Sequence, residues 1–474
     1  MSADPLLETL LEAPADPAER ALAARHAPVI RFDEREPFMP LAAGYTIFRA
    51  DGPSPSFPRQ VVLRSAGRPD AALAIEYAIW WDWDIGHLYE LEHIWVYLDD
   101  AGRLVHAEAS WHGGFHDMRQ AGAIPREGER AVVCSEPGKH AFAPDPAWFT
   151  ARAEPHQRST TEALAGAGGL LVTELFRDTI RRTPLADTLA RTYLARRAFT
   201  PAYAFTRRFT FGQEQLAPWP ALREWIPGRV GWWAERLRRE IPPEQYRHLR
   251  IGHRGAAGHA PDNSLAGVAA AADLGADAVE IDARLTRDGV AVASHDALLL
   301  GADGRPLVIG EHTLDELRAA GGRPIATLDE VVARCRALRL GLYLELKEGG
   351  AAQPALACLQ AHDHTDAAIV AAFRPDWLAD VRSLAPDMPT SVLFSSPQID
   401  AVALAAACGA SYVHPCWERR SARPDTLLTA EWAAAVRAAG LGIITWHEER
   451  PEVIDGLRRR GVDGICSDLP ELLR

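Results

Sequence analysis

The sequence predicts an α/β protein whose C-terminal half is a (β/α)8 TIM barrel, preceded by a β-rich, sandwich-like domain and a helical connecting segment. Three observations predict it. Short apolar segments alternate with Ala-rich amphipathic segments through the C-terminal half. The N-terminal part carries aromatic runs with strand-like alternation, and the segment between them spaces apolar residues as helices do. We therefore expect a β-rich domain over 1–149, a helical extension or linker over 150–248 and a barrel over 249–474.

Strands of the N-terminal domain are clearest in residues 74–84 (AIEYAIWWDWD) and 92–111 (EHIWVYLDDAGRLVHAEASW). The second segment holds Asp-Asp-Ala-Gly between two apolar runs, which is typical of a hairpin turn. A predominantly β domain follows from this pattern.

Helical periodicity in the connecting segment is clearest in residues 170–182 and 185–199. Prolines are frequent there, so we expect them to break the stretch into short helices. The aromatic segment 219–233 (WPALREWIPGRVGWW) suggests packing between domains, with a membrane-surface role as the alternative.

The barrel is predicted from eight apolar strands that alternate with helices over about 225 residues, the length and order of a (β/α)8 fold. The segment 284–296 follows the second strand through an Asp-Gly turn, so it should run back antiparallel as a hairpin extension. The eight expected strands lie at 250–253, 278–282, 340–347, 367–373, 390–394, 411–415, 441–446 and 463–468.

Composition excludes several classes of protein. The 51 basic and 64 acidic residues give a net charge of −13, which argues against a nucleic-acid binder held by bulk electrostatics. No apolar run reaches the roughly 18 residues that a membrane-spanning helix needs. The N-terminus lacks the basic and apolar regions of a signal peptide. Six cysteines without a C-x-x-C pair predict reduced thiols, so we expect a cytoplasmic protein.

Polar side chains stand at the ends of several predicted barrel strands, where a barrel of this kind builds its site. Glu280 and Asp282 share one face of a strand, as do Glu345 and Lys347, because side chains two positions apart point the same way. The same rim should receive His253, Arg254, His295 and Trp446.

These residue types indicate phosphodiester chemistry. Three carboxylates without a thiolate suit a hard divalent cation, Mg²⁺ or Ca²⁺. Arg254 and Lys347 suit phosphate oxygens, and His253 and His295 can serve as general acid and general base. Which histidine takes which role stays open at this point, as does the choice between direct hydrolysis and a cyclic intermediate.

These segments closely resemble the glycerophosphodiester phosphodiesterase family. IGHRGAAGHAPDNSLAG (251–267) is similar to the family's opening His-Arg-Gly…Pro-Glu-Asn-Thr signature. VEIDARLTRDGVAVASHD (279–296) is similar to its Glu-x-Asp strand and Asp-Gly…His-Asp hairpin. The resemblance covers about 245–474 and implies a TIM barrel that hydrolyses small glycerophosphodiesters to sn-glycerol 3-phosphate and an alcohol.

The resemblance also implies residue roles. By it, His253 and His295 are the acid/base pair, Glu280, Asp282 and Glu345 bind the metal, Arg254 and Lys347 hold the phosphate, and Trp446 lines the glycerol pocket. The sequence departs from the family pattern at Asp262 and Ser264, and after His295 in residues 297–314, a region that shapes the substrate pocket. The alcohol therefore stays open.

Two alternatives accompany this interpretation. One is a phospholipase D-like hydrolase of lysophospholipids, and the other is a binding or scaffold protein with an inactive barrel. The complete set of acid/base residues and metal ligands favours an enzyme.

The segment 82–95 (DWDIGHLYELEHIW) is a second candidate site, because its spacing can present Asp84, His87, Glu90 and Glu92 to one cation. It weakly resembles the motif of the β-sandwich family of necrosis-inducing proteins, although Tyr89 and Glu90 depart from that motif. Gly-Lys-His-Ala at 138–141 is similar to an element of vacuolar-sorting-type domains. A second metal site and a purely structural cluster both stay open, and the sequence identifies no partner for this domain.

Overall fold

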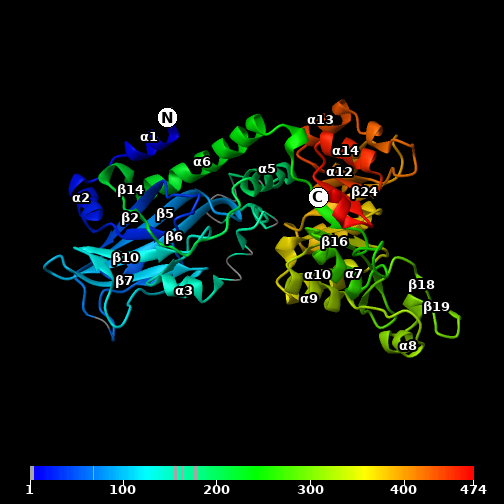
Figure 1. Cartoon of the computed structure of the whole chain (residues 1–474), viewed down its shortest axis with the longest axis horizontal. Helices are drawn as coiled ribbons and strands as arrows, with labels where there is room; N and C mark the ends of the chain where they lie inside the picture. Colours follow the sequence, from blue (N-terminus) through cyan, green and yellow to red (C-terminus); the bar gives the residue numbers. More distant parts are fainter. Residues whose placement is uncertain are drawn as a thin grey trace. The chain divides into compact units, whose positions relative to one another are not determined.

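The computed structural model describes residues 5–67, 69–153, 157, 159–162, 164–173, 179–180 and 182–474. Contacts divide the chain into two compact units. Unit 1 comprises Met1–Arg182 with Leu189–Glu240, and unit 2 comprises Thr183–Thr188 with Ile241–Arg474 (Figure 1). The predicted linker 150–248 is therefore shared between the two units.

Unit 1 is built on two sheets, which confirms the β-rich N-terminal domain. A seven-stranded sheet has the order β14-β2-β5-β6-β7-β8, with β12 on β6, and the predicted hairpin joins β6 to β7. A five-stranded sheet has the order β11-β10-β1-β13, with β9 on β10. The first sheet contains β2 (Ala42–Phe48), β5 (Leu73–Trp83), β6 (His87–Leu98), β7 (Leu104–Trp111), β8 (Gly114–Asp117), β12 (Gly169–Leu170) and β14 (Leu216–Pro218). The second contains β1 (Val29–Phe32), β9 (Arg126–Glu127), β10 (Arg130–Ser135), β11 (Phe142–Ala143) and β13 (Arg207–Phe209), and a separate pair is β3 (Gly52–Pro53) with β4 (Gln60–Val61).

Helix α6 (Trp219–Glu240) covers part of the larger sheet of unit 1 (Figure 1). A Cβ atom at Gly44 of β2 would lie 2.9 Å from Leu222 Cδ2, so this glycine lets the helix approach closely. The prediction that prolines break this segment was wrong for α6, which continues through Pro227. One proline removes one helical hydrogen bond, and the buried face of the helix outweighs that loss.

Among the described residues, the other helices that involve unit 1 are α1 (Pro5–Leu11), α2 (Pro17–His26), α3 (Pro146–Thr150) and α5 (Pro184–Ala195), with the 3-10 turn η1 (Gln213–Gln215). Helix α5 begins in unit 2 and ends in unit 1. The prediction of a helix over 170–182 was wrong at its start, because Leu170 pairs in strand β12, and part of that segment lies outside the described residues. None of the described helices is both long enough and apolar enough to cross a membrane.

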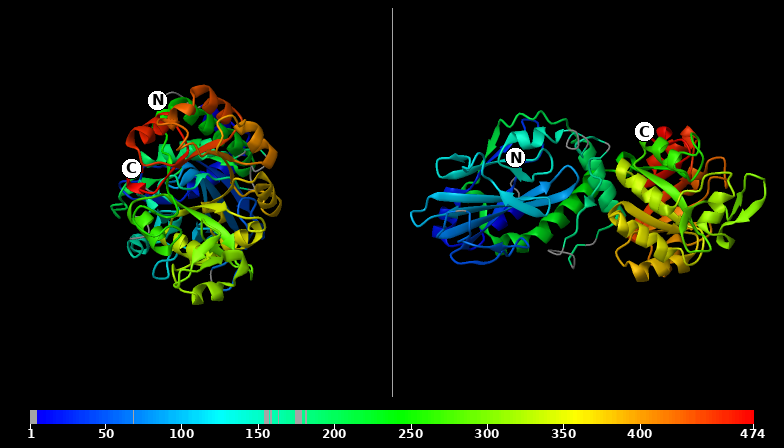
Figure 2. Two further views of the ribbon diagram at one scale, coloured as in Figure 1. Left: turned by 90° about the vertical axis from the view of Figure 1, so that its right-hand side faces the viewer. Right: turned by 90° about the horizontal axis from the view of Figure 1, so that it is seen from below.

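Unit 2 is a closed barrel of eight parallel strands, as predicted. Strand β15 pairs with both β25 and β16, which closes the sheet, and β17 (Ala291–Ala293) pairs antiparallel with β16 as the expected hairpin extension. The helices lie around the outside of the strands (Figure 2). The barrel strands are β15 (Leu249–Gly252), β16 (Ala278–Leu285), β20 (Gly341–Leu346), β21 (Ala368–Ala372), β22 (Thr390–Phe394), β23 (Tyr412–Pro415), β24 (Gly442–His447) and β25 (Gly464–Ser467).

The helices of unit 2 are α7 (Leu265–Asp273), α8 (Leu314–Ala319), α9 (Leu328–Leu338), α10 (Ala352–Ala361), α11 (Pro375–Leu384), α12 (Ala401–Cys408), α13 (Ala430–Ala438) and α14 (Pro451–Arg459). The short hairpin of β18 (Leu298–Leu300) and β19 (Pro306–Val308) follows β17. Five 3-10 turns complete the unit: η2 (Pro243–Gln245), η3 (Ile309–Glu311), η4 (Thr365–Ala367), η5 (Pro424–Leu427) and η6 (Pro470–Leu473).

Alternation along the barrel strands positions the site. Val279 and Ile281 of β16 belong to the core that contains the helices' apolar side chains, whereas Ala278 belongs to a separate cluster with inward-facing residues of other strands. Glu280 and Asp282 follow Ala278 at intervals of two, so they also face inward, near the C-terminal end of the strand. The barrel therefore presents both carboxylates at the end where such folds build their sites.

Candidate active site

The first strand of the barrel ends in a tight turn that carries His253 and Arg254. Arg254 and Gly255 both have positive φ, 51° and 94°. A Cβ atom at residue 255 would lie 2.6 Å from the carbonyl carbon of Gly267 in α7, so the turn requires glycine there. This conformation directs the backbone N–H of Arg254 to Glu280 Oε2, at 2.9 Å.

Three carboxylates converge at the barrel end: Glu280, Asp282 and Glu345, each with one oxygen within 4.8 Å of the others. All three are buried, with 4%, 1% and 7% of their surface exposed. Burial, followed by repulsion from Asp282 and Glu345, raises the pKa of Glu280 well above its usual range. An all-oxygen, crowded anionic set of this kind fits a hard divalent cation such as Mg²⁺ or Ca²⁺.

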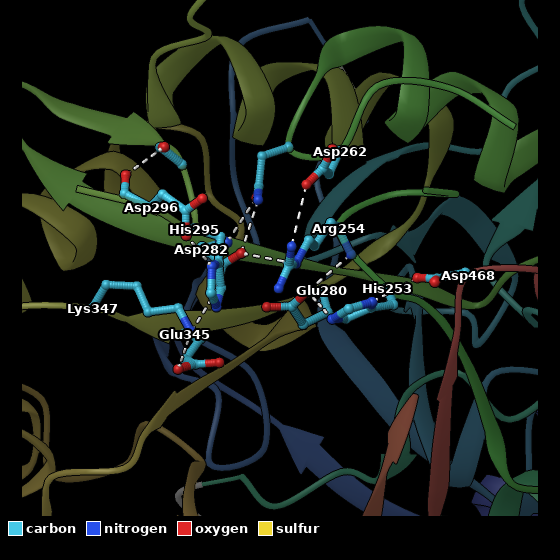
Figure 3. A network of polar contacts seen from close by, with 12 residues as sticks. His253, Arg254, Asp262, Glu280, Asp282, His295, Asp296, Glu345, Lys347 and Asp468 are labelled. Atoms are coloured by element: carbon cyan, nitrogen blue, oxygen red, sulfur yellow. Dashed lines mark hydrogen bonds and ion pairs between the residues drawn. The ribbon is translucent and has the colours of Figure 1, made fainter. Parts of the chain in front are cut away.

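Two cationic side chains border the carboxylates (Figure 3). Lys347 Nζ lies 2.6 Å from Glu345 Oε1 and 3.1 Å from Asp282 Oδ1. Burial alone would lower the pKa of Lys347, but Asp282 and Glu345 together raise it, so the side chain is a cation at neutral pH. On the other side, Arg254 lies 3.5 Å from Asp282 Oδ2 through Nε and 3.2 Å from Asp262 Oδ2 through Nη1. Asp282 thus lies between two cations.

His253 is oriented by a carboxylate. Its Nδ1 lies 2.6 Å from Asp468 Oδ1, just beyond the end of β25. Because an ionised carboxylate only accepts hydrogen bonds, Nδ1 carries the proton and Nε2 is left for chemistry. Nε2 lies 4.0 Å from Glu280 Oε2. Burial lowers the pKa of His253, and the hydrogen bond to Asp468 opposes this shift.

His295 lies at the end of the hairpin that extends β16. Its Nδ1 is 2.7 Å from Asp296 Oδ1, and 39% of its side chain is exposed. Arg284 of β16 donates through Nε and Nη2 to the carbonyl oxygen of His295, at 3.0 and 2.8 Å. This anchor holds His295 at the barrel end that carries the carboxylates (Figure 3), and the exposed fraction of the side chain shows that the ring is accessible.

Asn263 contributes to the site although the sequence argument did not assign it a role. It donates from Nδ2 to Asp282 Oδ2 at 2.8 Å and accepts from the Asp282 backbone N–H at 2.9 Å. This double contact fixes the carboxylate through a residue that is 3% exposed. The signal was present in the Pro-Asp-Asn-Ser segment quoted above.

The structure does not bring Trp446 to this cluster. A bulge interrupts the register between Thr445 and His447. Trp446 is 2% exposed, packs with Trp417 in the core and donates from Nε1 to Glu448. His447 instead stacks on His253, with ring centroids 4.5 Å apart and planes at 5°.

His447, Glu449 and Asp468 form a further group of potential ligand atoms within 4.8 Å of one another, beside His253. None of these three residues was assigned to the site from the sequence. The signal for Asp468 was its place at the end of the last predicted strand, and that for His447 was its place directly after Trp446.

A pocket of about 620 Å³ opens next to the first-strand turn. Pro261 and Ser264 line it and flank Asp262 and Asn263, which contact the site residues. Its charged groups are paired, Arg318 with Glu330 and Arg323 with Asp262. The lining residues are Pro261, Ser264, Leu265, Ala266, Leu317, Arg318, Gly321, Gly322, Arg323, Pro324, Ile325, Ala326 and Glu330.

In unit 1, the structure brings together three of the four predicted ligands of a second site. Asp84, His87 and Glu90 have ligand atoms within 4.8 Å of one another. Glu92 is outside this group and accepts a hydrogen bond from Ser110 Oγ. Burial raises the pKa of Glu92 to about 7, and burial followed by repulsion from Glu92 raises that of Glu90 well above its usual range.

Comparison with known proteins concerns the C-terminal half of the chain. Residues 253–472 match the model of the Glycerophosphoryl diester phosphodiesterase family. A glycerophosphodiester phosphodiesterase of Caldanaerobacter subterraneus subsp. tengcongensis is 26% identical over 240 residues, which are 48% of this chain and 96% of that relative. Another, from Bacillus subtilis, is 25% identical over 255 residues, 48% of this chain and 85% of the relative.

Among solved structures, that of a glycerophosphodiester phosphodiesterase from Thermotoga maritima is 25% identical, with a TM-score of 0.40 over 48% of this chain and 97% of that one. The family match lies within unit 2. The resemblance of the N-terminal half to necrosis-inducing and vacuolar-sorting-type domains stays a prediction.

Proposed function

Unit 2 of this chain belongs to the glycerophosphoryl diester phosphodiesterase family of phosphoric diester hydrolases, and from this premise we propose that it hydrolyses glycerophosphodiesters to sn-glycerol 3-phosphate and an alcohol. The observation that carries the proposal is the convergence of three buried carboxylates with an arginine, a lysine and an oriented histidine at one end of the barrel. These are the groups that binding and cleaving a phosphodiester require.

The charged groups of the site bind the substrate. Glu280, Asp282 and Glu345 would hold Mg²⁺ or Ca²⁺, which when bound neutralises phosphate charge and polarises the reacting phosphorus centre. Arg254 and Lys347 flank the same carboxylates and supply fixed positive charge for the phosphate oxygens. Asn263 keeps Asp282 in one orientation, so the site is organised before substrate arrives.

Proton transfer falls to His253 and His295. Asp468 fixes the His253 tautomer, so Nε2 is the atom that takes up or releases a proton. The ring of His295 is accessible and takes the complementary role. One of the two imidazoles deprotonates the nucleophile, and the other protonates the departing alcohol. The nucleophile is water or the substrate's own 2-hydroxyl group.

A matched pair of variants tests the proposal. We expect Glu280→Gln to lower the release of glycerol 3-phosphate from glycerophosphocholine by at least about 100-fold, the scale of losing a group essential for transition-state charge. Glu311→Gln, at an exposed position of the same unit, should retain wild-type release. Equal release by both variants, each with the wild-type circular dichroism spectrum, would contradict the proposed site.

A second candidate function is hydrolysis of lysophospholipids in the manner of phospholipase D. The pocket of about 620 Å³ favours it, because its apolar lining and paired charges suit a hydrocarbon chain next to the phosphate site. Leu298 and Leu300, which follow His295 closely in the chain, add exposed apolar surface.

Filling the pocket separates the two substrates. Ala266 is exposed on α7 and lines the pocket, so Ala266→Trp should lower turnover of lysophosphatidylcholine while that of glycerophosphocholine is kept. Ala434→Trp, on an exposed site of α13, is the matched control. Equal effects of Ala266→Trp on both substrates would rule out this use of the pocket.

A cytoplasmic site of action also stays a prediction. It depends on the six cysteines, all free and buried or half-buried. Fractionation of the host cell with an antibody against the chain would check it.

A further inference from the structure

The turn between β5 and β6 of unit 1 is organised by one buried carboxylate. Asp84, which has no exposed surface, accepts hydrogen bonds through Oδ1 from the backbone N–H groups of Gly86 and His87, at 2.5 and 2.6 Å. Its other oxygen, Oδ2, lies 2.7 Å from Lys139 Nζ and 3.5 Å from His87 Nε2. The turn therefore fixes one carboxylate oxygen and directs the second toward a lysine and an imidazole.

His87 has a defined tautomer. Its Nδ1 lies 2.8 Å from the carbonyl oxygen of Tyr89, which only accepts, so Nδ1 carries the proton. Tyr89 adopts a positive φ of 63°, which places that carbonyl oxygen within reach. Nε2 is left with its lone pair near two carboxylates, 3.5 Å from Asp84 Oδ2 and 4.0 Å from Glu90 Oε2. A nitrogen and two oxygens, all electron-pair donors, thus surround one point.

The surroundings add negative charge. Glu92 and Glu136 are buried close to this group, at 8% and 3% exposure. Glu136 is paired with His112, whose Nε2 lies 2.9 Å away. Lys139 forms an ion pair with Asp84. Four carboxylates, Asp84, Glu90, Glu92 and Glu136, therefore lie near one lysine and three histidines, of which His112 pairs with Glu136. An added positive charge would relieve the repulsion between these carboxylates.

We propose that Asp84, His87 and Glu90 form a binding site for a divalent transition-metal cation, Zn²⁺ or Mn²⁺, in unit 1. One imidazole nitrogen with two carboxylate oxygens is a donor set for these ions, whereas the all-oxygen set of unit 2 suits Mg²⁺ or Ca²⁺. The outer contacts that a histidine ligand needs are in place, because the Tyr89 carbonyl already orients the ring.

Lys139 is the competitor of the metal in this proposal. Its Nζ lies over the turn, next to the place that a Cβ atom at Gly86 would occupy, so a larger residue at position 86 would push the ammonium group away from its present contact with Asp84. A cation that binds Asp84 Oδ2 must displace this ammonium group. Lys139 therefore supplies the positive charge when the metal is absent and lowers the apparent affinity for it.

Calorimetric titration of the untagged full chain with ZnCl₂ tests the site, in saturating MgCl₂ to occupy the barrel carboxylates. The expected result is a Zn²⁺ site in the wild-type chain whose affinity falls at least about tenfold in Glu90→Gln and His87→Gln, whereas any Zn²⁺ bound by His447, Glu449 and Asp468 of unit 2 is unchanged in these variants. Glu34→Gln, at an exposed glutamate of the same unit, is the control and should bind as the wild type does.

A Lys139→Met variant tests the competition. We expect Zn²⁺ to bind it about tenfold more tightly than wild type and to raise its unfolding temperature more. The circular dichroism spectrum and the urea unfolding transition of each variant chain without Zn²⁺ report whether it is folded, independently of Zn²⁺ binding and of hydrolysis by unit 2. Absence of a Zn²⁺ site in the wild type, or equal affinity in wild type, Glu90→Gln and His87→Gln, would overturn the proposal; unchanged affinity in Lys139→Met would overturn the role of the lysine.

Discussion

Individual residues of the barrel site act through fixed partners. Asp468 sets the protonated nitrogen of His253, Asn263 sets the orientation of Asp282, and the Arg254 backbone binds Glu280. The sequence could predict the inner set, because strand-end carboxylates and histidines follow directly from alternation and strand position. It could not predict their partners, since these contacts join residues up to 215 positions apart.

Trp446 and His447 show where the prediction of single site residues from the sequence fails. Strict alternation along the strand would place Trp446 on the face that carries the site. The bulge in β24 changes which side chain lies on that face. A bulge depends on how two strands pair, so a single strand sequence does not reveal it. His447, stacked on His253, is the residue that the structure places there.

Removal of the His295 imidazole should lower the rate of catalysis without affecting folding. We expect His295→Ala to lower the turnover number by about 10²–10⁴-fold, the scale of losing a general acid or base. The side chain is 39% exposed, so folding should not suffer. Steady-state kinetics on glycerophosphocholine measures the effect.

His259→Ala is the matched control, because His259 is similarly exposed and pairs with Glu471 away from the carboxylates. Loss of turnover in both variants, or in neither, would contradict the assigned role of His295.

At the level of elements, the turn from β15 to α7 determines whether the site can assemble. Its glycine combines a positive φ with a close approach to α7, and the neighbouring N–H of Arg254 binds a carboxylate of the cluster. The sequence predicted all eight barrel strands and the hairpin, because apolar runs and an Asp-Gly turn carry strong local signals. It did not predict the unbroken α6, since burial of one face outweighs the local effect of Pro227.

A glycine pair tests the turn. Gly255→Ala combines the cost of a left-handed backbone with a clash against Gly267, so we expect a loss of about 2–5 kcal/mol in the free energy of unfolding. Gly289→Ala has a similar φ of 79° and no atom within 4 Å of the added Cβ, so only the backbone cost of about 1–2 kcal/mol should remain.

Urea unfolding of both variants measures these losses. Equal losses would show that the contact between the turn and α7 contributes nothing to stability.

At the scale of the whole molecule, the two units differ in what the sequence reveals. The barrel has local alternation and strand-end chemistry, so its fold and most of its candidate site follow from the sequence. In unit 1, pairings such as β1 with β10 and β14 with β2 bring together segments about 100 or more residues apart. No local signal records such pairings, and the sequence therefore predicted only β-rich structure there.

Stability of unit 2 should depend on pH through His248, just before the first barrel strand. Burial lowers its pKa to about 4, whereas an exposed histidine has a pKa of about 6.5. The unfolded chain then binds the proton more readily below pH 6.5, so stability is full above that pH and falls as pH decreases toward 4. At pH 5 the linkage amounts to about 2 kcal/mol.

His248→Gln should remove this part of the pH dependence, so its free energy of unfolding by urea should fall less than that of wild type between pH 7.5 and pH 5. Parallel curves for wild type and variant would contradict the assignment to His248.

The most direct test of the central claim is release of glycerol 3-phosphate from glycerophosphocholine by the full chain, after EDTA treatment and again after addition of Mg²⁺ or Ca²⁺. We expect no release in EDTA and recovery with one of the two ions, because we propose that Glu280, Asp282 and Glu345 bind a divalent cation. Undiminished release in EDTA would contradict that cation site, and no release under any condition would contradict the proposed hydrolysis of glycerophosphodiesters.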